Sequence, residues 1–258
     1  MRFTIITPTY RRHDKLSRCV QSVLNQTYTD WEMIIVNDSP HDNSYQTFTS
    51  SINDPRIHYH INDTNRGVNY SRNFAMDKAS SDSKWTVFLD DDDYLAPDAL
   101  QTFHDLIVSH SDKKWFITNR AYVNGKPVTQ FPNPESEYSY IWDCLILKRG
   151  KGDVTHCIET KLLTTNHIRY SKFIKQAEEW IFYYQISLKE KMYYHDHNST
   201  ITDGYDVQNG LNFRKRTREE QFNNLIKFIY EGQRLHLIKH PTFILYLFMR
   251  FIRLCIKT

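Results

Sequence analysis

The chain has 258 residues, of which 40% are hydrophobic and 14% aromatic, with only 7 Gly and 8 Pro. This composition excludes a disordered, collagenous or low-complexity protein, and the length suits one large α/β domain, alone or with a small appendage. The formal net charge of +3 is unevenly distributed, because the residues from Leu211 onward carry 10 Lys and Arg against 3 Asp and Glu, whereas the remainder carries 23 against 27. The C-terminal part is therefore basic and the body mildly acidic.

The first half of the chain alternates apolar strand patterns with helical ones. Strands are predicted at Arg2–Ile6, Trp31–Val36, Arg56–Ile61 and Trp85–Leu89. Helical spacing follows the first strand, at Leu16–Leu24, and the third strand, at Val68–Lys78. Repetition of strand, polar loop and helix about every 30 residues predicts a mostly parallel α/β sheet flanked by helices, with ligands bound at the carboxyl ends of its strands.

The pattern loosens after about residue 110, where the sheet's second half is expected. The segments predicted there are a strand at Trp115–Val123, a Tyr- and Trp-rich stretch at Tyr138–Leu147, a basic loop at Arg149–Asp153, a helix at Glu178–Leu188 and a short strand at Met192–Tyr194. The basic loop is expected to act as a lid or to border an acceptor. The expected domain spans residues 1–205, in two halves at 1–110 and 111–205, before a helical extension at 206–258.

An apolar strand at Val87–Leu89 stops abruptly at four consecutive aspartates, Asp90–Asp93. Carboxylates crowded at the end of a buried strand need a compensating cation, because desolvated like charges otherwise shift their pKa values or destabilise the fold. A divalent ion with oxygen ligands, Mg²⁺ or Mn²⁺, would fill this role. The alternative is a solvated acidic turn without a ligand.

Further polar side chains are expected at the same edge. Asp38, after the second strand, suits hydrogen bonds from a base or a ribose, although it could equally be a turn or capping residue. Arg72 is placed to meet phosphate oxygens, with a surface ion pair as the alternative. Glu178 and Glu179 precede an amphipathic helix, where they would either complement the helix dipole or supply a general base for a hydroxyl.

Cysteine and histidine positions add little chemistry. Cys19, Cys144, Cys157 and Cys255 form no CxxC pair, so neither a zinc knuckle nor a redox dithiol is indicated. His195 and His197 share one face of a strand-like segment, and His197 is a weak candidate for an imidazole ligand to the metal, since lone histidines are more often structural. The first residues do not resemble a signal peptide and no apolar stretch predicts a membrane-spanning helix, so a cytoplasmic protein is expected.

The segment Phe243–Ile256 predicts a basic amphipathic helix. Its basic residues, Arg250, Arg253 and Lys257, fall on one face. Its apolar residues are Ile244, Leu247, Phe248, Phe251, Leu254 and Cys255. Such a helix would lie in a membrane interface, or instead dock on its own domain or on a second subunit in a homodimer. Nucleic acid is not an expected partner, because no array of stacking aromatics accompanies the charges.

The order of these motifs resembles that of the family 2 glycosyltransferases with the GT-A fold. The resemblance covers about residues 1 to 200. It rests on Ile6–Arg12, Gln21–Thr27, Trp31–Asp38, Asn65–Gly67, Ser71–Asn73, Phe88–Leu95 and Glu178–Trp180. It implies a nucleotide-sugar donor, a divalent metal on the diphosphate, and inversion at the anomeric carbon.

The resemblance also implies roles for individual residues. The expected donor-binding residues are Thr7, Pro8, Thr9, Arg11, Asp38, Asn65, Gly67, Arg72, Asp90 and Asp91. Asp92 would be the direct metal ligand, with Asp90 near the ribose and His197 as a further candidate ligand. Glu179 would deprotonate the acceptor hydroxyl, with Glu178 beside it. The chain departs from the family pattern at four places. Arg11 replaces the usual Asn, Asp38-Ser39-Pro40 replaces an Asp-Gly-Ser turn, Glu179 replaces the commoner Asp, and His197 matches the family's late His only loosely. The resemblance also implies that residues 1–110 bind the nucleotide sugar and residues 111–205 the acceptor.

The sequence therefore predicts a metal-dependent, inverting hexosyltransferase on the inner face of the cytoplasmic membrane. The expected donor is a UDP-hexose or UDP-N-acetylhexosamine. The expected acceptor is a lipid-linked glycan of a bacterial surface polysaccharide, such as O-antigen, capsule or lipooligosaccharide. Two alternatives stay open: a nucleotidyltransferase, which would favour a Gly-rich, Lys-bearing loop that Thr7–Arg12 lacks, and a non-catalytic protein that binds a sugar nucleotide.

Overall fold

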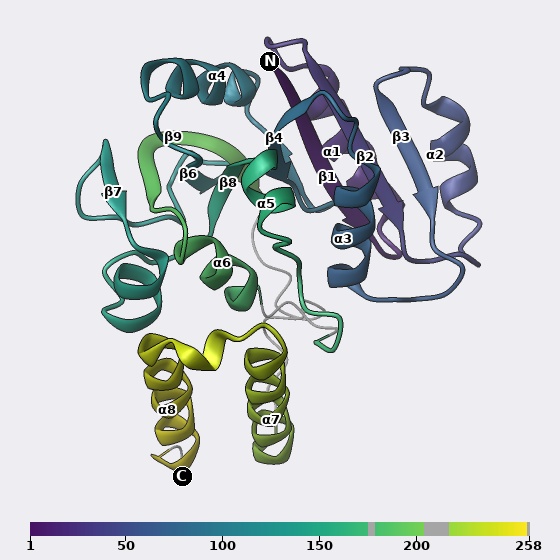
Figure 1. Cartoon of the computed structure of the whole chain (residues 1–258). Coiled ribbons are helices and arrows are strands. Elements are labelled where there is room, and N and C mark those ends of the chain that lie inside the picture. Colours follow the sequence, from purple (N-terminus) through teal and green to yellow (C-terminus); the bar gives the residue numbers. More distant parts are fainter. Residues whose placement is uncertain (175–178, 204–216, 257–258) are drawn as a thin grey trace.

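The structure is a computed structural model that describes residues 1–174, 179–203 and 217–256. The described residues form one sheet of nine strands in the order β3-β2-β1-β4-β8-β6-β9-β5, with β7 paired to β9 (Figure 1). The strands are β1 (Arg2–Thr9), β2 (Trp31–Asn37), β3 (Ile57–Ile61), β4 (Ser83–Phe88), β5 (Asp93–Leu95), β6 (Trp115–Tyr122), β7 (Ser136–Tyr138), β8 (Val154–Glu159) and β9 (Met192–Thr202). The helices are α1 (His13–Leu24), α2 (Tyr45–Ser51), α3 (Val68–Lys78), α4 (Ala99–Ser109), η1 (Tyr140–Ile146), α5 (Thr160–Thr165), α6 (Trp180–Ser187), α7 (Arg218–Arg234), η2 (Leu237–Lys239) and α8 (Pro241–Ile256).

The predicted fold class, a central α/β sheet flanked by helices, is confirmed. Strands β3, β2, β1 and β4 are parallel to one another, as the alternation of strands and helices predicts. The other half of the sheet is mixed, because β8 runs antiparallel to both β4 and β6, while β9 is parallel to β6. The parallel half brings the carboxyl ends of β1, β2 and β4 to one edge.

Each face of the sheet has its own hydrophobic core. Side chains of a strand alternate between its two faces, so Phe3 and Ile5 pack with α1 and α4, whereas Ile6 packs with α3, α5 and α6 on the opposite side. Strand β2 is buried along its whole length and divides in the same way. This double burial explains the continuous apolar runs of β1 and β2.

Three elements of the second half differ from the sequence predictions. Tyr140–Ile146, within the Tyr- and Trp-rich stretch, forms a π-helix. The strand predicted at Met192–Tyr194 continues to Thr202, because it pairs with β6 along nearly its whole length and then with β5. The predicted helix at Glu178–Leu188 is α6, which begins at Trp180 in the described residues.

The C-terminal helices α7 and α8 pack side by side below the sheet (Figure 1). A third hydrophobic core joins them to α6 and η1 through Trp180, Phe228 and Phe243, among others. The expected boundary at residue 205 lies outside the described residues. No helix among the described residues combines the length and the apolar character needed to cross a bilayer.

One basic residue of the C-terminal helix packs on the third hydrophobic core. Arg250 lies over Phe228, with its guanidinium carbon 4.6 Å from the ring centre, and near Trp180 at 5.8 Å, whereas Arg253 is exposed. The stacking of a guanidinium on aromatic rings stabilises this inward position. Lys257, the third basic residue of the predicted face, lies outside the described residues.

Candidate active site

A cavity of about 980 Å³ opens at the carboxyl edge of the parallel strands. Nine of the predicted site residues line it: Pro8, Thr9, Arg11, Asp38, Arg72, Asp90, Asp91, Asp92 and Glu179. They come from the end of β1 and the loop after it, from the loops after β2 and β4, from α3 and from the residue before α6. The sheet topology therefore brings residues as far apart in the sequence as Pro8 and Glu179 into one site.

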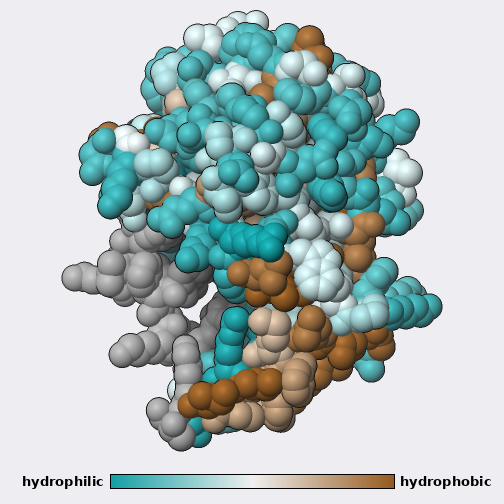
Figure 2. Space-filling view, turned by 90° about the vertical axis from the view of Figure 1, so that its left-hand side faces the viewer, coloured by the Kyte–Doolittle hydropathy of each residue, from teal (hydrophilic) through white to brown (hydrophobic). Residues whose placement is uncertain are grey.

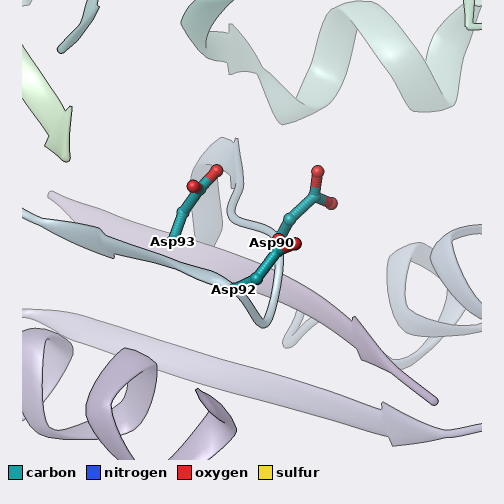
Figure 3. Close-up of side chains that lie close together, drawn as sticks. All are labelled: Asp90, Asp92 and Asp93. Atoms are coloured by element: carbon teal, nitrogen blue, oxygen red, sulfur yellow. The ribbon is translucent and has the colours of Figure 1, made fainter. Parts of the chain in front are cut away.

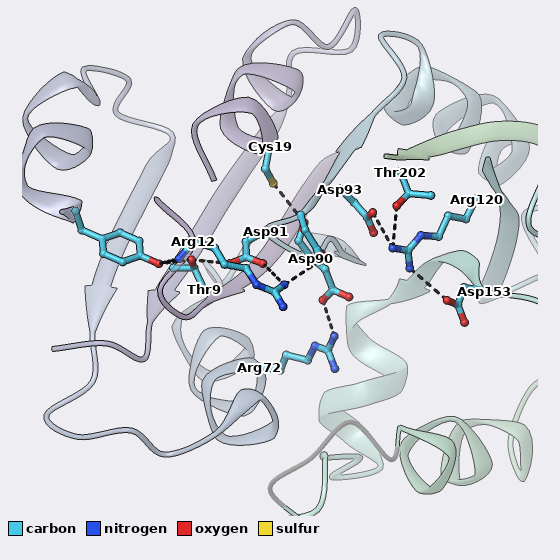
Figure 4. Close-up of polar contacts among 12 residues, drawn as sticks. Thr9, Arg12, Cys19, Arg72, Asp90, Asp91, Asp93, Arg120, Asp153 and Thr202 are labelled. Carbon is cyan, nitrogen blue, oxygen red and sulfur yellow. Dashed lines mark hydrogen bonds and ion pairs between the residues drawn. The ribbon is translucent and has the colours of Figure 1, made fainter. Parts of the chain in front are cut away.

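The four consecutive aspartates are each paired with an arginine (Figure 4). Arg72 donates to Asp90 at 2.7 Å, and Arg120 donates to Asp93 at 2.7 Å. Arg12 donates from Nη1 to both remaining carboxylates, at 3.2 Å to Asp91 and 2.8 Å to Asp92. Much of the cation charge that the sequence assigned to a metal ion is thus supplied by arginines from other elements.

Compensation by the arginines is incomplete for two of the carboxylates. Burial raises the pKa of Asp93 to about 7, with the charges of Asp90 and Asp92 adding to the effect and Arg120 opposing it. Burial likewise raises the pKa of Asp91 to about 6, against the hydrogen bond from Thr9. For Asp90, burial is outweighed by the charges of Arg72 and Arg120, so its pKa is lowered. The cluster therefore retains an excess of negative charge when fully ionised.

Oxygen atoms of Asp90, Asp92 and Asp93 lie within 4.8 Å of one another (Figure 3). A set of carboxylate oxygens is the donor set that Mg²⁺ and Mn²⁺ prefer, so these residues fit a divalent ion. His197 does not belong to this group: its Nδ1 lies 2.9 Å from Ser199 and its Nε2 lies 3.3 Å from Asp98. Asp93, which the sequence analysis did not single out as a ligand, takes its place.

Asp38 is buried and holds the loop that begins α3. Its Oδ1 accepts hydrogen bonds from Asn62 and from the backbone N–H of Arg66, and its Oδ2 accepts one from the N–H of Gly67, each at 2.7 Å. Gly67 has a φ of 87°, a conformation that favours glycine, which explains its place before the helix. Asp38 still lines the cavity, whereas Gly67 and the exposed Asn65 do not.

Two further predicted donor residues lie on either side of the strand end. Thr7 is fully buried and does not line the cavity. Arg11, with a φ of 53°, is exposed at the rim and donates its backbone N–H to Ser39. Thr7 therefore acts on the site at most through its neighbours.

Arg72 joins the aspartate cluster to Glu179. Its Nη2 donates to Asp90, its Nη1 donates to Glu179, and its side chain is almost fully buried. Burial raises the pKa of Glu179, with Arg72 acting in the opposite direction. The Glu179 side chain makes no capping hydrogen bond to α6 and is held by Arg72 instead. Glu178 lies outside the described residues.

The second half of the chain adds four aromatic side chains to the cavity lining, Phe131, Tyr140, His156 and Tyr183, and these are called the aromatic wall. His156 stacks on Tyr183, with ring centres 3.9 Å apart, and its Nδ1 accepts a hydrogen bond from Trp115. Burial, followed by the charge of Arg72, lowers the pKa of His156 to about 3. The imidazole is therefore neutral, with its proton on Nε2. Residues 150–153 of the predicted lid loop also line the cavity.

Sequence reasoning missed the partners of the aspartates. Arg12 lies in the motif Ile6–Arg12, so the sequence indicated that it lies near the site but not that it pairs with aspartates. Arg120 and Asp153 form a second pair, with Arg120 Nη1 3.4 Å from Asp153, at the far end of the aspartate cluster. No local signal marks Arg120, because its contacts join β6 to Asp93, the first residue of β5, and to Asp153, just before β8.

Comparison with known proteins identifies relatives that are glycosyltransferases. Residues 4–165 match the family described as Glycosyl transferase family 2. The chain is 40% identical over 101 residues to the colanic acid biosynthesis glycosyl transferase WcaA of Escherichia coli strain K12, a match that covers 39% of this chain and 36% of that protein. The chain therefore spans little more than a third of that relative.

Two staphylococcal relatives extend over most of the chain. The poly(ribitol-phosphate) beta-N-acetylglucosaminyltransferase TarP of Staphylococcus aureus strain N315 is 25% identical over 255 residues, covering 89% of this chain and 72% of that protein. The crystal structure of S. aureus TarS 1-349 in complex with UDP-GlcNAc superposes with a TM-score of 0.71 at 20% identity, covering 89% of this chain and 67% of that chain. This likeness shows that the two proteins share their fold.

Proposed function

The chain belongs to the family 2 glycosyltransferases, and we propose that it moves one sugar from a UDP-sugar donor to a hydroxyl group of a glycan, with inversion at the anomeric carbon. The observation that carries this proposal is the position of Arg72 between Asp90 and Glu179. One guanidinium holds a carboxylate of the aspartate cluster and a carboxylate with a raised pKa in the same cavity. Displacement at the anomeric carbon needs stabilisation of the leaving diphosphate on one side of that carbon and a base for the acceptor hydroxyl on the other. The aspartate cluster and Glu179 would supply these two functions.

In this proposal Glu179 is the general base. It accepts the proton of the acceptor hydroxyl while that oxygen attacks the anomeric carbon, and the bond to the nucleoside diphosphate breaks on the far side. Burial raises the pKa of Glu179, which improves a carboxylate as a base near neutral pH. Arg72 orients Glu179 through one nitrogen, and the guanidinium has further N–H groups for an oxygen of the diphosphate.

The donor wall would be formed by Pro8, Thr9, Asp38, Arg72 and the aspartates. Asp90, Asp92 and Asp93 would hold Mn²⁺ or Mg²⁺, an ion that neutralises charge on the leaving diphosphate. A UDP-hexose or UDP-N-acetylhexosamine is the proposed donor class. It is supported by the shared fold of TarS, whose crystal structure holds UDP-GlcNAc.

The proposed acceptor is a growing glycan of a bacterial cell-surface polysaccharide. This assignment is supported by relatives named for colanic acid biosynthesis and for modification of poly(ribitol-phosphate). We further propose that the acceptor is lipid-linked and that the enzyme works at the inner face of the cytoplasmic membrane. The aromatic wall around Tyr140, His156 and Tyr183 would contact the acceptor sugar, since aromatic faces pack well on apolar faces of sugar rings.

Calorimetric titration of UDP into the protein in the presence of Mn²⁺ tests the donor site, with Asp92→Ala as the variant. We expect binding that requires the metal ion and is reduced at least tenfold by Asp92→Ala. Asp105→Ala, at an exposed site on α4, is the matched control and should leave binding unchanged. Absence of UDP binding to the unaltered protein would contradict the UDP assignment.

A further inference from the structure

The outward side of α8 is apolar and exposed. Phe248 is 56% exposed, Ile244 49%, Phe251 42% and Ile252 37%, and the exposed Cys255 lies among them on the helix surface. These positions recur at three- and four-residue intervals, so they form one stripe. Figure 2 shows apolar side chains gathered over the lower part of the molecule, where α8 lies. A contiguous apolar stripe of this kind marks a surface that contacts something other than water.

The side of α8 that faces the protein is already filled. Phe243, Tyr246 and Leu247 are buried in the third hydrophobic core, and Arg250 lies over Phe228. Docking on its own domain therefore accounts for one side of the helix. The stripe of Ile244, Phe248, Phe251 and Ile252 is left for another occupant.

Positive charge accompanies the apolar stripe. Arg253 is exposed on α8, Lys239 is exposed just before the helix, and α8 contains no acidic residue. Lys148, whose Nζ lies 5.9 Å from the Tyr246 ring centre, extends the charge toward the cavity that it lines. Partial burial and then the charges of Arg253 and Arg250 lower the pKa of Lys148, which shows that the three cations share one region.

This combination of apolar stripe and cations fits an anionic lipid surface better than a second copy of the chain. A second α8 offers no carboxylate, so two apposed helices would supply no negative charge for Arg253 or Lys239. A bilayer with anionic headgroups supplies both the apolar layer and the negative charge. With 16 residues, α8 is about 24 Å long, shorter than the hydrocarbon core of about 30 Å, so it suits a position along the surface.

We propose that α8 docks this protein on an anionic lipid bilayer, with Ile244, Phe248, Phe251 and Ile252 inserted among the lipids and Arg253, Lys239 and Lys148 facing the phosphate headgroups. The helix then lies parallel to the membrane. Because Lys148 lines the cavity, the aromatic wall opens beside the headgroup layer. The inference deepens the proposed function, since it places the acceptor wall where the head of a lipid-linked glycan would be found.

Cosedimentation of the full chain with vesicles tests this proposal without any sugar transfer. Vesicles of phosphatidylcholine alone are compared with vesicles that also contain phosphatidylglycerol. We expect binding to the anionic vesicles that falls about tenfold or more in Phe248→Ser/Ile252→Ser, because two half-exposed apolar side chains no longer enter the lipid. Arg253→Gln should weaken binding about fivefold on the anionic vesicles and leave binding to the neutral vesicles unchanged.

The matched control is Val108→Ser/Val123→Ser, which removes two exposed apolar side chains, 63% and 65% exposed, away from α8. It should bind vesicles as the unaltered protein does. Failure of the unaltered protein to bind anionic vesicles would overturn the proposal, as would equal binding by the Phe248→Ser/Ile252→Ser variant. A dimer in sedimentation velocity that this variant dissociates would assign the stripe to a second copy instead. Titration of UDP into the same variants reports on the donor site separately.

Discussion

The two walls of the cavity differ in the kind of side chain that lines them. On the donor wall, charged groups outnumber apolar ones, and nearly every carboxylate is held by an arginine, as Asp91 and Asp92 are by Arg12. On the acceptor wall, aromatic rings stack on one another, and the titratable His156 is kept neutral by burial and by the charge of Arg72. A wall of paired charges suits a metal ion and a diphosphate, whereas aromatic rings and a neutral imidazole suit contact with a sugar ring.

Arg72 is the residue at which the walls meet. It is the shared partner of Asp90 on the donor side and of Glu179 beside the acceptor side. Arg72 acts to lower the pKa of both carboxylates, but the net pKa of Asp90 is lowered, whereas burial outweighs Arg72 at Glu179 and raises its pKa. The comparison therefore predicts three kinds of variant. One kind lowers kcat but leaves UDP affinity unchanged, a second lowers both, and a third weakens only acceptor recognition.

The largest effect is expected from Glu179→Gln. Loss of the general base should lower kcat by about 100- to 10,000-fold, while the amide keeps the size of the side chain and a contact with Arg72. UDP affinity, measured by calorimetry, should change less than threefold. Glu190→Gln is the control, because burial also raises the pKa of Glu190 although it does not line the cavity. Full activity of Glu179→Gln would show that this residue is not the base and would leave it a positioning role as a partner of Arg72.

A second effect, on both walls, is expected from Arg72→Lys. A lysine ammonium keeps the charge but cannot span Asp90 and Glu179 as a planar fork does. The loss of one charge-assisted hydrogen bond should reduce kcat/KM by about 10- to 100-fold and weaken UDP binding as well. Arg169→Lys is the control, since Arg169 pairs with the exposed Asp77 at 2.8 Å. A variant that loses kcat but keeps UDP affinity would confine Arg72 to the acceptor side.

A smaller and more selective effect is expected from His156→Gln. Glutamine can still accept the hydrogen bond from Trp115, but the stacking on Tyr183 and the Nε2 donor are lost. The KM for the acceptor should rise about two- to tenfold, the value of one hydrogen bond, with UDP affinity unchanged. Initial rates measured over a range of acceptor concentrations give this result. A rise in the KM for the donor alone would remove His156 from the acceptor wall.

The sequence predicted the donor wall far better than the acceptor wall. Strands β1, β2 and β4 have buried apolar runs that end in polar residues, so the pattern alone places Thr9, Asp38 and Asp90 at one edge. The acceptor wall depends on long-range pairing, as in the parallel alignment of β9 with β6, whose register shifts twice. Periodicity showed that α8 has two faces, but only the position of Trp180 and Phe228 decides which face is covered.

The smallest effect concerns stability and separates the metal site from its arginines. In the folded protein the pKa of Asp93 is raised from 3.8 to about 7, so the folded state holds a proton that the unfolded chain releases near pH 4. Its contribution to stability therefore falls as the pH rises from about 4 through about 7. An asparagine side chain at this position cannot ionise, so Asp93→Asn lacks this loss of stability. We therefore expect the difference in free energy of unfolding, Asp93→Asn minus unaltered protein, to increase by about 1–3 kcal/mol between pH 4.5 and pH 8. Urea unfolding in EDTA measures this difference.

Two further measurements test this last prediction, one with Mn²⁺ added and one on a variant of a surface carboxylate. A divalent ion stabilises ionised carboxylates, so Mn²⁺ should reduce the gain of Asp93→Asn at pH 8. At the exposed Asp105 the pKa is lowered by hydrogen bonds from His104 and Gln101, so Asp105→Asn should change relative stability with pH in the opposite direction. A gain that Mn²⁺ leaves unchanged would mean that Arg120 alone compensates Asp93, and the metal ion would then be held by Asp90 and Asp92 without it.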